Sequence, residues 1–213
     1  GSDGTVYFVS KDGNLYAFSS DGAKKWQFAT GGPVPPPSVD RQGTIYVGSY
    51  DGFLYALNLD RTENWKYRIR DPFGRKGVIG SSCALDEDGT IYFLLRPLGN
   101  PPKPPPPDVF RDWSLDPFVA VGLTALRPDG TTKFASSDGQ FSWVPVIGQG
   151  NTLYGAPLSA GGLPNLFTVS SSGDVKSSAT LQQNFNWIRA TTPLAVAADG
   201  TLYLGAAEGN FTF

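Results

Sequence analysis

The sequence offers few side chains that could carry out catalysis. Its 213 residues contain no histidine and a single cysteine, Cys83. Imidazole general bases, histidine-ligated zinc, CxxC motifs and intrachain disulfides are therefore excluded. Cys83 lies in a run of mostly small residues from Gly80 to Leu85 without a cationic side chain, and reactive thiols need such a neighbour and exposure. We interpret Cys83 as a buried, inert thiol.

The densest group of carboxylates is Asp86-Glu87-Asp88, directly before Gly89. Calcium prefers oxygen ligands of this kind. A loop of the EF-hand type, however, needs alternating acidic positions followed by a distant glutamate, which this stretch lacks. Because the same Asp-Gly step recurs at Asp3-Gly4 and Asp199-Gly200, we interpret Asp88-Gly89 as a turn rather than as part of a metal site.

A proline-rich insertion over residues 95–118 is the segment best suited to bind a partner. The prolines between 101 and 107 fix φ and remove backbone donors, which predicts a stiff polyproline II rod that cannot join a sheet. Such a rod loses little entropy on binding. The aromatic residues after it either pack over the fold or anchor a protein partner. The candidate partner-binding residues are Pro104, Pro105, Phe110, Arg111, Trp113 and Phe118.

Composition indicates a folded, turn-rich chain. It contains 26 glycines and 18 prolines, with 13% aromatic and only 17% charged residues. The 17 basic and 19 acidic residues leave no positive surplus for nucleic acid, and the apolar runs are too short to span a bilayer. We expect neither a nucleic-acid partner nor a transmembrane segment. Because the chain has no methionine and opens Gly1-Ser2, we also expect a fragment or a processed product.

An internal repeat determines the architecture. A Gly-Thr-hydrophobic-Tyr strand recurs in five copies, with repeat tyrosines Tyr7, Tyr46, Tyr92, Tyr154 and Tyr203. A second element, Asp12 to Phe18, recurs clearly at Asp51 to Leu57 and in degraded form later, and a Gly-containing turn then leads to an aromatic such as Trp26 or Trp65. The regular placement of these tryptophans favours core packing between repeats over ligand stacking.

The period of the repeat predicts propeller blades. Each segment is strand-length and is bounded by Asp-Gly or Gly-Asn, the strongest short hairpin signal. The shortest spacing between repeat tyrosines, 39 residues, accommodates four short strands and their turns. Runs such as 33–39 and 79–85 are predicted to be innermost strands. No helical periodicity persists, so we predict an all-β fold: a β-propeller of about five four-stranded repeats with incomplete terminal blades.

We expect a single propeller domain over 1–213. The predicted blade-like units cover residues 1–32, 33–70, 71–136, 137–185 and 186–213. Loops between the first and second elements should leave on the same face as the connections between blades. That face would carry the 95–118 insertion, residues 155–164 and the basic connection 69–77.

The first two copies, with the pattern DGxxYxxxxDGxLYA followed by a Gly turn and Trp, resemble the PQQ-like β-propeller repeat. That family includes quinoprotein dehydrogenases and the periplasmic propeller lipoprotein of the outer-membrane β-barrel assembly machine. The resemblance covers the specific motif in about the first third of the chain. The enzymatic branch would require eight blades, a vicinal cysteine pair, a calcium ion and a catalytic aspartate. One cysteine forbids the pair, so we expect no cofactor and no quinone-dependent turnover.

The sequence therefore favours a non-catalytic scaffold or interaction module, outside the cytoplasm, that binds a protein through its long-loop face. Two alternatives remain open. The chain could be a piece of a quinone-dependent dehydrogenase whose active site lies in further repeats, or a carbohydrate or surface-polymer binding module, because aromatic loops also stack on sugars. The first copy lacks an inner strand and the last lacks an outer one. We expect such open edges to be covered by further blades or by another chain.

Overall fold

A computed structural model of the chain describes residues 1–32, 34–70, 76–97, 122–136, 146–155, 165–180, 188–190, 195–197, 199–203 and 206–208. Within these ranges all regular structure is β-strand apart from one short 3₁₀ turn, η1 (Gln149–Asn151). The predicted all-β fold is confirmed. No helix in the described ranges is long and apolar enough to cross a membrane.

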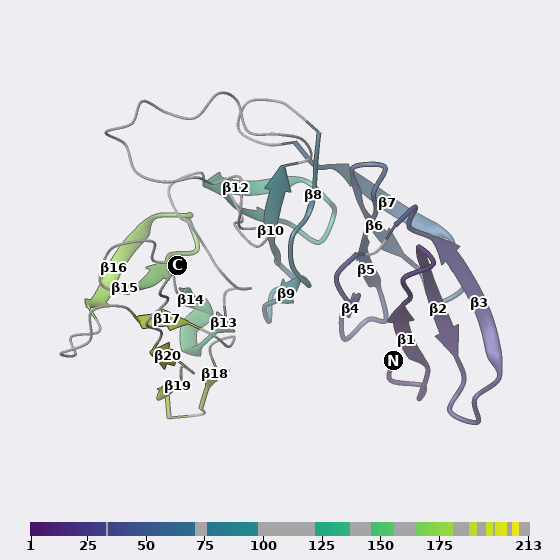
Figure 1. The fold of residues 1–213 in the computed structure, drawn as a ribbon, viewed down its shortest axis with the longest axis horizontal. Coiled ribbons are helices and arrows are strands. Elements are labelled where there is room, and N and C mark those ends of the chain that lie inside the picture. Colours follow the sequence, from purple (N-terminus) through teal and green to yellow (C-terminus); the bar gives the residue numbers. More distant parts are fainter. Residues whose placement is uncertain are drawn as a thin grey trace.

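The strands form five consecutive groups, which we call blades 1 to 5 (Figure 1). Blade 1 contains β1 (Val6–Val9), β2 (Asn14–Phe18) and β3 (Lys24–Ala29). Blade 2 contains β4 (Ser38–Val39), β5 (Ile45–Gly48), β6 (Phe53–Leu57) and β7 (Glu63–Arg68). Blade 3 contains β8 (Gly77–Ile79), β9 (Ala84–Leu85), β10 (Ile91–Pro97), β11 (Gly122–Leu126) and β12 (Thr132–Ser136). Blade 4 contains β13 (Val146–Ile147), β14 (Leu153–Gly155), β15 (Asn165–Val169) and β16 (Val175–Thr180). Blade 5 contains β17 (Ile188–Ala190), β18 (Ala195–Val196), β19 (Leu202–Tyr203) and β20 (Ala206–Glu208).

In blades 1, 2 and 4 successive strands pair antiparallel with their neighbours. In blade 3 both β8 and β9 pair with β10, and the strands of blade 5 form two separate pairs, β17 with β20 and β18 with β19. The blades follow one another along an arc (Figure 1). The inner strands β4, β9, β13 and β18 lie on its concave side, and β3, β7, β12 and β16 lie on its convex side. Blade 1 and blade 5 are at the two ends of this arc. This is the radial arrangement that the repeat predicts.

The inner strands are shorter than the sequence predicted. In blade 2 only Ser38–Val39 is strand, because Pro35, Pro36 and Pro37 have no N–H to donate to a ladder. In blade 3 the inner strand breaks between β8 and β9. The break leaves Leu94 facing Ser81, whose hydroxyl accepts the Leu94 N–H at 3.1 Å. A side chain thus replaces the missing backbone partner.

The blades pack through aromatic residues of their outer strands. The indole Nε1 of Trp26 donates to the carbonyl of Leu59, in the β6–β7 turn of blade 2, at 2.8 Å. In the same way, Nε1 of Trp65 donates to the carbonyl of Pro128, in the β11–β12 turn of blade 3, at 2.9 Å. Both indoles also pack against the hydrophobic clusters between their blades. The predicted packing role of these tryptophans is confirmed.

Gly130 shows why this turn needs a glycine. Its φ is +82°, a left-handed conformation that costs an L side chain energy. In addition, a Cβ built at Gly130 would lie 2.8 Å from Trp65 Cδ2. The Trp65 ring therefore lies directly on the glycine. In the next blade Phe134 takes the place of the indole, and a Cβ at Gly173 would lie 2.6 Å from its ring.

Antiparallel pairing places the chain connections at two opposite ends of the blades. The turns β4–β5, β9–β10 and β13–β14 lie at one end, which we call the pocket end. Strand termini Arg68 and Gly77, Pro97 and Gly122, and Gly155 and Asn165 lie at the other, which we call the connection end.

Candidate functional site

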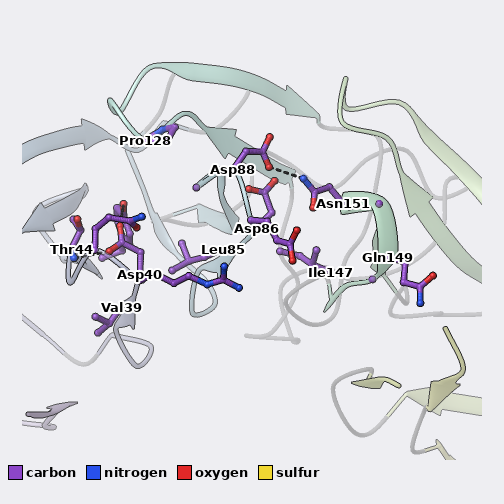
Figure 2. Close-up of a pocket in the computed structure, with 17 residues that line it drawn as sticks. Val39, Asp40, Thr44, Leu85, Asp86, Asp88, Pro128, Ile147, Gln149 and Asn151 are labelled. Carbon is purple, nitrogen blue, oxygen red and sulfur yellow. Dashed lines mark hydrogen bonds between the residues drawn. The ribbon is translucent and has the colours of Figure 1, made fainter. Parts of the chain in front are cut away.

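The pocket end contains a cavity of about 1250 Å³ where turns of blades 2, 3 and 4 converge (Figure 2). Its walls carry carboxylates, amides and one guanidinium. The polar lining residues include Asp40, Arg41, Gln42, Asp86, Glu87, Asp88, Gln149 and Asn151. The cavity is large enough for a small molecule, so its carboxylates are candidates for an acid, a base or a ligand.

Asp40 and Asp86 occupy equivalent positions in blades 2 and 3, and both carboxylates accept hydrogen bonds from their own blade. Oδ1 of Asp86 accepts the Thr90 N–H at 2.7 Å, and Oδ2 accepts the Tyr92 hydroxyl at 2.8 Å. Asp40 makes the same pair of bonds with Thr44 and Tyr46, at 2.7 and 2.9 Å. These carboxylates close their turns and satisfy buried phenols.

The phenols of Tyr46 and Tyr92 are correspondingly poor acids. Burial is the main cause that raises the pKa of each hydroxyl, and the hydrogen bond to Asp40 or Asp86 raises it further. Both side chains are almost fully buried in the blade packing. Both phenols therefore stay protonated at neutral pH and cannot act as bases.

Asp88 joins blade 3 to blade 4. The side-chain amide of Asn151 donates to Asp88 Oδ1 at 2.6 Å, as Figure 2 shows. Lys133 Nζ lies 3.8 Å from the other carboxylate oxygen and donates to the Thr90 hydroxyl at 3.0 Å. Hydrogen bonding with Asp86 is the largest cause that lowers the pKa of Asp88, and Lys133 and Asn151 act in the same direction. Asp88 is therefore ionised and paired.

The interpretation of Asp88-Gly89 as a turn is confirmed. Gly89 has φ +79°, and its N–H donates to the Asp86 carbonyl at 3.1 Å. In the part of the chain that the structure describes, no three His, Cys, Asp or Glu side chains converge to hold a metal ion. The acidic run is thus a hydrogen-bonded turn.

Sequence reasoning missed the carboxylate–phenol pairs, although a signal for them exists. Asp40 and Asp86 each precede a glycine by three residues and a repeat tyrosine by six. A variant of the pair occurs at exposed positions, where Tyr16 donates to Asp12 and Tyr55 to Asp51, both at 2.6 Å. The spacing alone could have identified these residues as structural.

Cys83 lies in the break between β8 and β9 and packs against the cluster between blades 2 and 3. The residue as a whole is partly exposed, but burial of its thiol raises the pKa to about 12. Its carbonyl accepts the Ser38 hydroxyl from the neighbouring blade at 2.6 Å. These contacts agree with a structural role.

We expect Cys83 to react slowly with thiol reagents in the native protein. Because the pKa rises from 9.0 to about 12, the thiolate fraction at pH 8 falls about a thousandfold relative to an ordinary thiol. Reaction with a chromogenic disulfide in buffer and in denaturant measures the ratio. A native rate within tenfold of the denatured rate would contradict an inert thiol.

The predicted partner-binding residues Pro104, Pro105, Phe110, Arg111, Trp113 and Phe118 lie outside the described residues, as do most of the 95–118 insertion and the center of the 69–77 connection. The structure does describe the strands that carry them. Leu95 and Gly122 are directly opposed in the β10–β11 ladder, at the connection end.

The chain is similar to several solved structures. One is a protein of unknown function from Bacteroides caccae, with a TM-score of 0.58 and 12% identity over 94% of this chain and 66% of that one. Another is a proposed gluconolactonase, with a TM-score of 0.53 and 15% identity over 95% of this chain and 68% of that one. The fold is a β-propeller.

A third similar structure is BamB from Moraxella catarrhalis, with a TM-score of 0.48 and 18% identity over 97% of this chain and 65% of that one. The chain thus spans about two thirds of the length of the structures it matches. At these identities the similarity concerns the fold alone. No protein-family model and no curated protein matches the sequence.

Proposed function

We propose that this chain is a non-catalytic propeller module that binds a protein partner at its connection end. The observation that carries the proposal is that three of the four carboxylates lining the pocket, those of Asp40, Asp86 and Asp88, are bound to other groups of the protein. Asp40 and Asp86 each accept two hydrogen bonds from their own turns, and Asp88 is paired with Asn151 and Lys133. An acid or base catalyst must exchange a proton with its substrate. Asp40 and Asp86 instead use both of their carboxylate oxygens to accept hydrogen bonds from the fold.

The connection end supports the second half of the proposal. The insertion leaves blade 3 between Pro97 and Gly122, at the same end as the strand termini that flank the other long connections. Its prolines and aromatics have the composition of a pre-organised docking element. The resemblance to the scaffold branch of the PQQ-like repeat family further favours a place outside the cytoplasm.

Deletion of residues 100–116 is expected to abolish partner binding and to leave the fold intact. Leu95 and Gly122 remain opposed across the β10–β11 ladder, so the shorter loop closes between neighbouring residues. Loop-closure entropy varies slowly with length, and the thermal midpoint should shift by less than about 3 °C. Circular dichroism checks the fold. An unfolded deletion variant would show that the aromatics belong to the core.

Binding is tested by photo-crosslinking in a lysate of the source cells, followed by mass spectrometry and by titration of the recovered partner. A crosslinker at position 113 should capture a defined protein, whereas one at Tyr203, an exposed residue of blade 5, should not. The purified partner should bind the intact chain and lose at least about tenfold affinity for Trp113→Ala. Glycan binding that requires Trp113, or dye reduction with added quinone, would overturn the proposal in favour of the other two functions.

A further inference from the structure

Blades 2 and 3 each have one face that packs against the preceding blade, and we call it the receiving face. In blade 2 it consists of Ile45, Val47, Tyr55 and Leu57, which are opposed in pairs across the β5–β6 ladder. Ile45, Val47 and Leu57 are at most 1% exposed because blade 1 covers them. In blade 3 the same register positions hold Ile91, Phe93, Thr124 and Leu126. All four residues are at most 6% exposed. Ile91, Phe93 and Leu126 belong to the hydrophobic cluster between blades 2 and 3, and Thr124 does not.

The receiving face of blade 1 is equally apolar but is uncovered in the described structure. Its register positions hold Val6, Phe8, Tyr16 and Phe18. Val6 is 56% and Phe8 44% exposed. The Phe8 ring stacks on Tyr16 and Phe18 with centroids 5.6 and 5.5 Å apart, so the aromatics form one continuous patch. Terminal repeats that face water normally carry polar side chains there.

Within the described residues, blade 1 also has an unoccupied site for an aromatic ring at its β2–β3 turn, and we call this site the seat. Trp26 and Trp65 each donate to a carbonyl of the following blade, that of Leu59 in the β6–β7 turn or of Pro128 in the β11–β12 turn. Each acceptor is the second residue of its turn. Ser20 is the equivalent residue of the β2–β3 turn, which has the same hydrogen bonds as the other turns. A Cβ built at Gly22 in this turn meets nothing within 4 Å, whereas one at Gly130 meets Trp65 at 2.8 Å.

We propose that the receiving face of blade 1 packs against another blade of this repeat, one whose outer strand brings an indole to the Ser20 carbonyl. The interfaces between blades 1 and 2 and between blades 2 and 3 each combine an apolar receiving face with a turn carbonyl that accepts an indole N–H. Blade 1 presents both features, and neither is occupied in the described structure. Solved structures of the same fold are about half as long again as this chain, which is room for further blades. A preceding blade in the same ring is the occupant that fits both features.

The test adds such a blade to the full chain. Residues 1–41 are fused in front of residues 3–213, so that Asp3 takes the place of Gln42 and the 39-residue period continues. The added copy of Trp26 then faces the Ser20 carbonyl of the original blade 1. Burial of Val6 and Phe8 should raise the thermal midpoint by about 5–10 °C relative to the unfused chain. An unchanged midpoint would overturn the proposal.

Two copies of Gly22 provide a matched control. Gly22→Val in the original blade 1 blocks the filled seat and should remove most of the gain. The same substitution in the added copy has the same backbone strain but displaces no indole, so it should remove clearly less of the gain. Trp26→Ala in the added copy should act like the first variant. Equal losses from both Gly22→Val variants would show that the seat is not used.

A second measurement on the unfused chain keeps the test independent of the fusion. Phe8→Ser should leave the thermal midpoint within about 3 °C, because Phe8 is 44% exposed and its side chain contacts rings on its own face only. Val47→Ser, at the equivalent buried position, should lower it by about 5 °C or more. Similar losses would show that the chain already covers the face. A concentration-dependent dimer in light scattering that Phe8→Ser disperses would assign the face to a second copy and also overturn the proposal.

Discussion

Replacement of Gly130 by alanine is expected to lower the free energy of unfolding by about 3 kcal/mol. The left-handed backbone, with φ +82°, accounts for about 1 kcal/mol. The rest comes from Trp65, because the new methyl group would lie 2.8 Å from Cδ2 and 2.9 Å from Cε3 of its ring. The indole must move, which loosens its packing and its hydrogen bond to the Pro128 carbonyl. Urea unfolding followed by tryptophan fluorescence measures the loss.

Gly22→Ala is the matched control for this prediction. Gly22 occupies the same turn position in blade 1 with φ +87°, but its built Cβ meets no atom within 4 Å. Its substitution should cost only the backbone strain, about 1 kcal/mol. If Gly22→Ala and Gly130→Ala lost the same stability, the Trp65 contact would contribute nothing to blade packing.

Asp86→Ala should lower the free energy of unfolding by about 3 kcal/mol. The substitution leaves the buried Tyr92 hydroxyl and the buried Thr90 N–H without acceptors, and each unpaired buried donor costs about 1–3 kcal/mol. Tyr92→Phe in the Asp86→Ala background should recover about 1 kcal/mol, since it removes one of the two unpaired donors. Urea unfolding of the four proteins of this cycle gives both values.

Asp12→Ala provides the comparison at the surface. Asp12 accepts from the Tyr16 hydroxyl and the Asn14 N–H, but both bonds are exposed to water, which can replace the carboxylate. We expect a loss below about 1 kcal/mol. Equal effects at Asp12 and Asp86 would mean that Asp86 is free to act on a ligand rather than being held by the fold.

The sequence predicted the elements that depend on local chemistry. Glycines of the Asp-Gly turns, such as Gly4 and Gly200, have positive φ as expected. The repeat tyrosines and the outer tryptophans lie in equivalent strands of successive blades, because their period matched one blade. Hairpin signals of this kind depend on a few neighbouring residues, so they can be recognised in the sequence without knowledge of the rest of the fold.

Features that depend on contacts between blades were not predicted. Arg61 occupies a left-handed position, φ +75°, where the equivalent turns have glycine, and its guanidinium donates to the Gln27 carbonyl of blade 1 at 3.1 Å. The bond between Asn151 and Asp88 joins residues 63 positions apart. The residues next to Arg61 and Asn151 in the sequence do not indicate that either side chain bonds to another blade. The pocket itself exists only once three turns converge, so its carboxylates looked alike in the sequence.

The indole hydrogen bonds between blades have a consequence for the nascent chain. Both point forward: Trp26 needs Leu59, 33 residues later, and Trp65 needs Pro128, 63 residues later. At about 5–20 residues per second, a ribosome supplies these acceptors after about 2–7 s and 3–13 s. Limited proteolysis of ribosome-bound chains arrested beyond residues 100 and 170 would reveal when Trp65 becomes protected. The proline-rich insertion thus delays burial of the second blade, which stays open to other nascent chains about twice as long as the first.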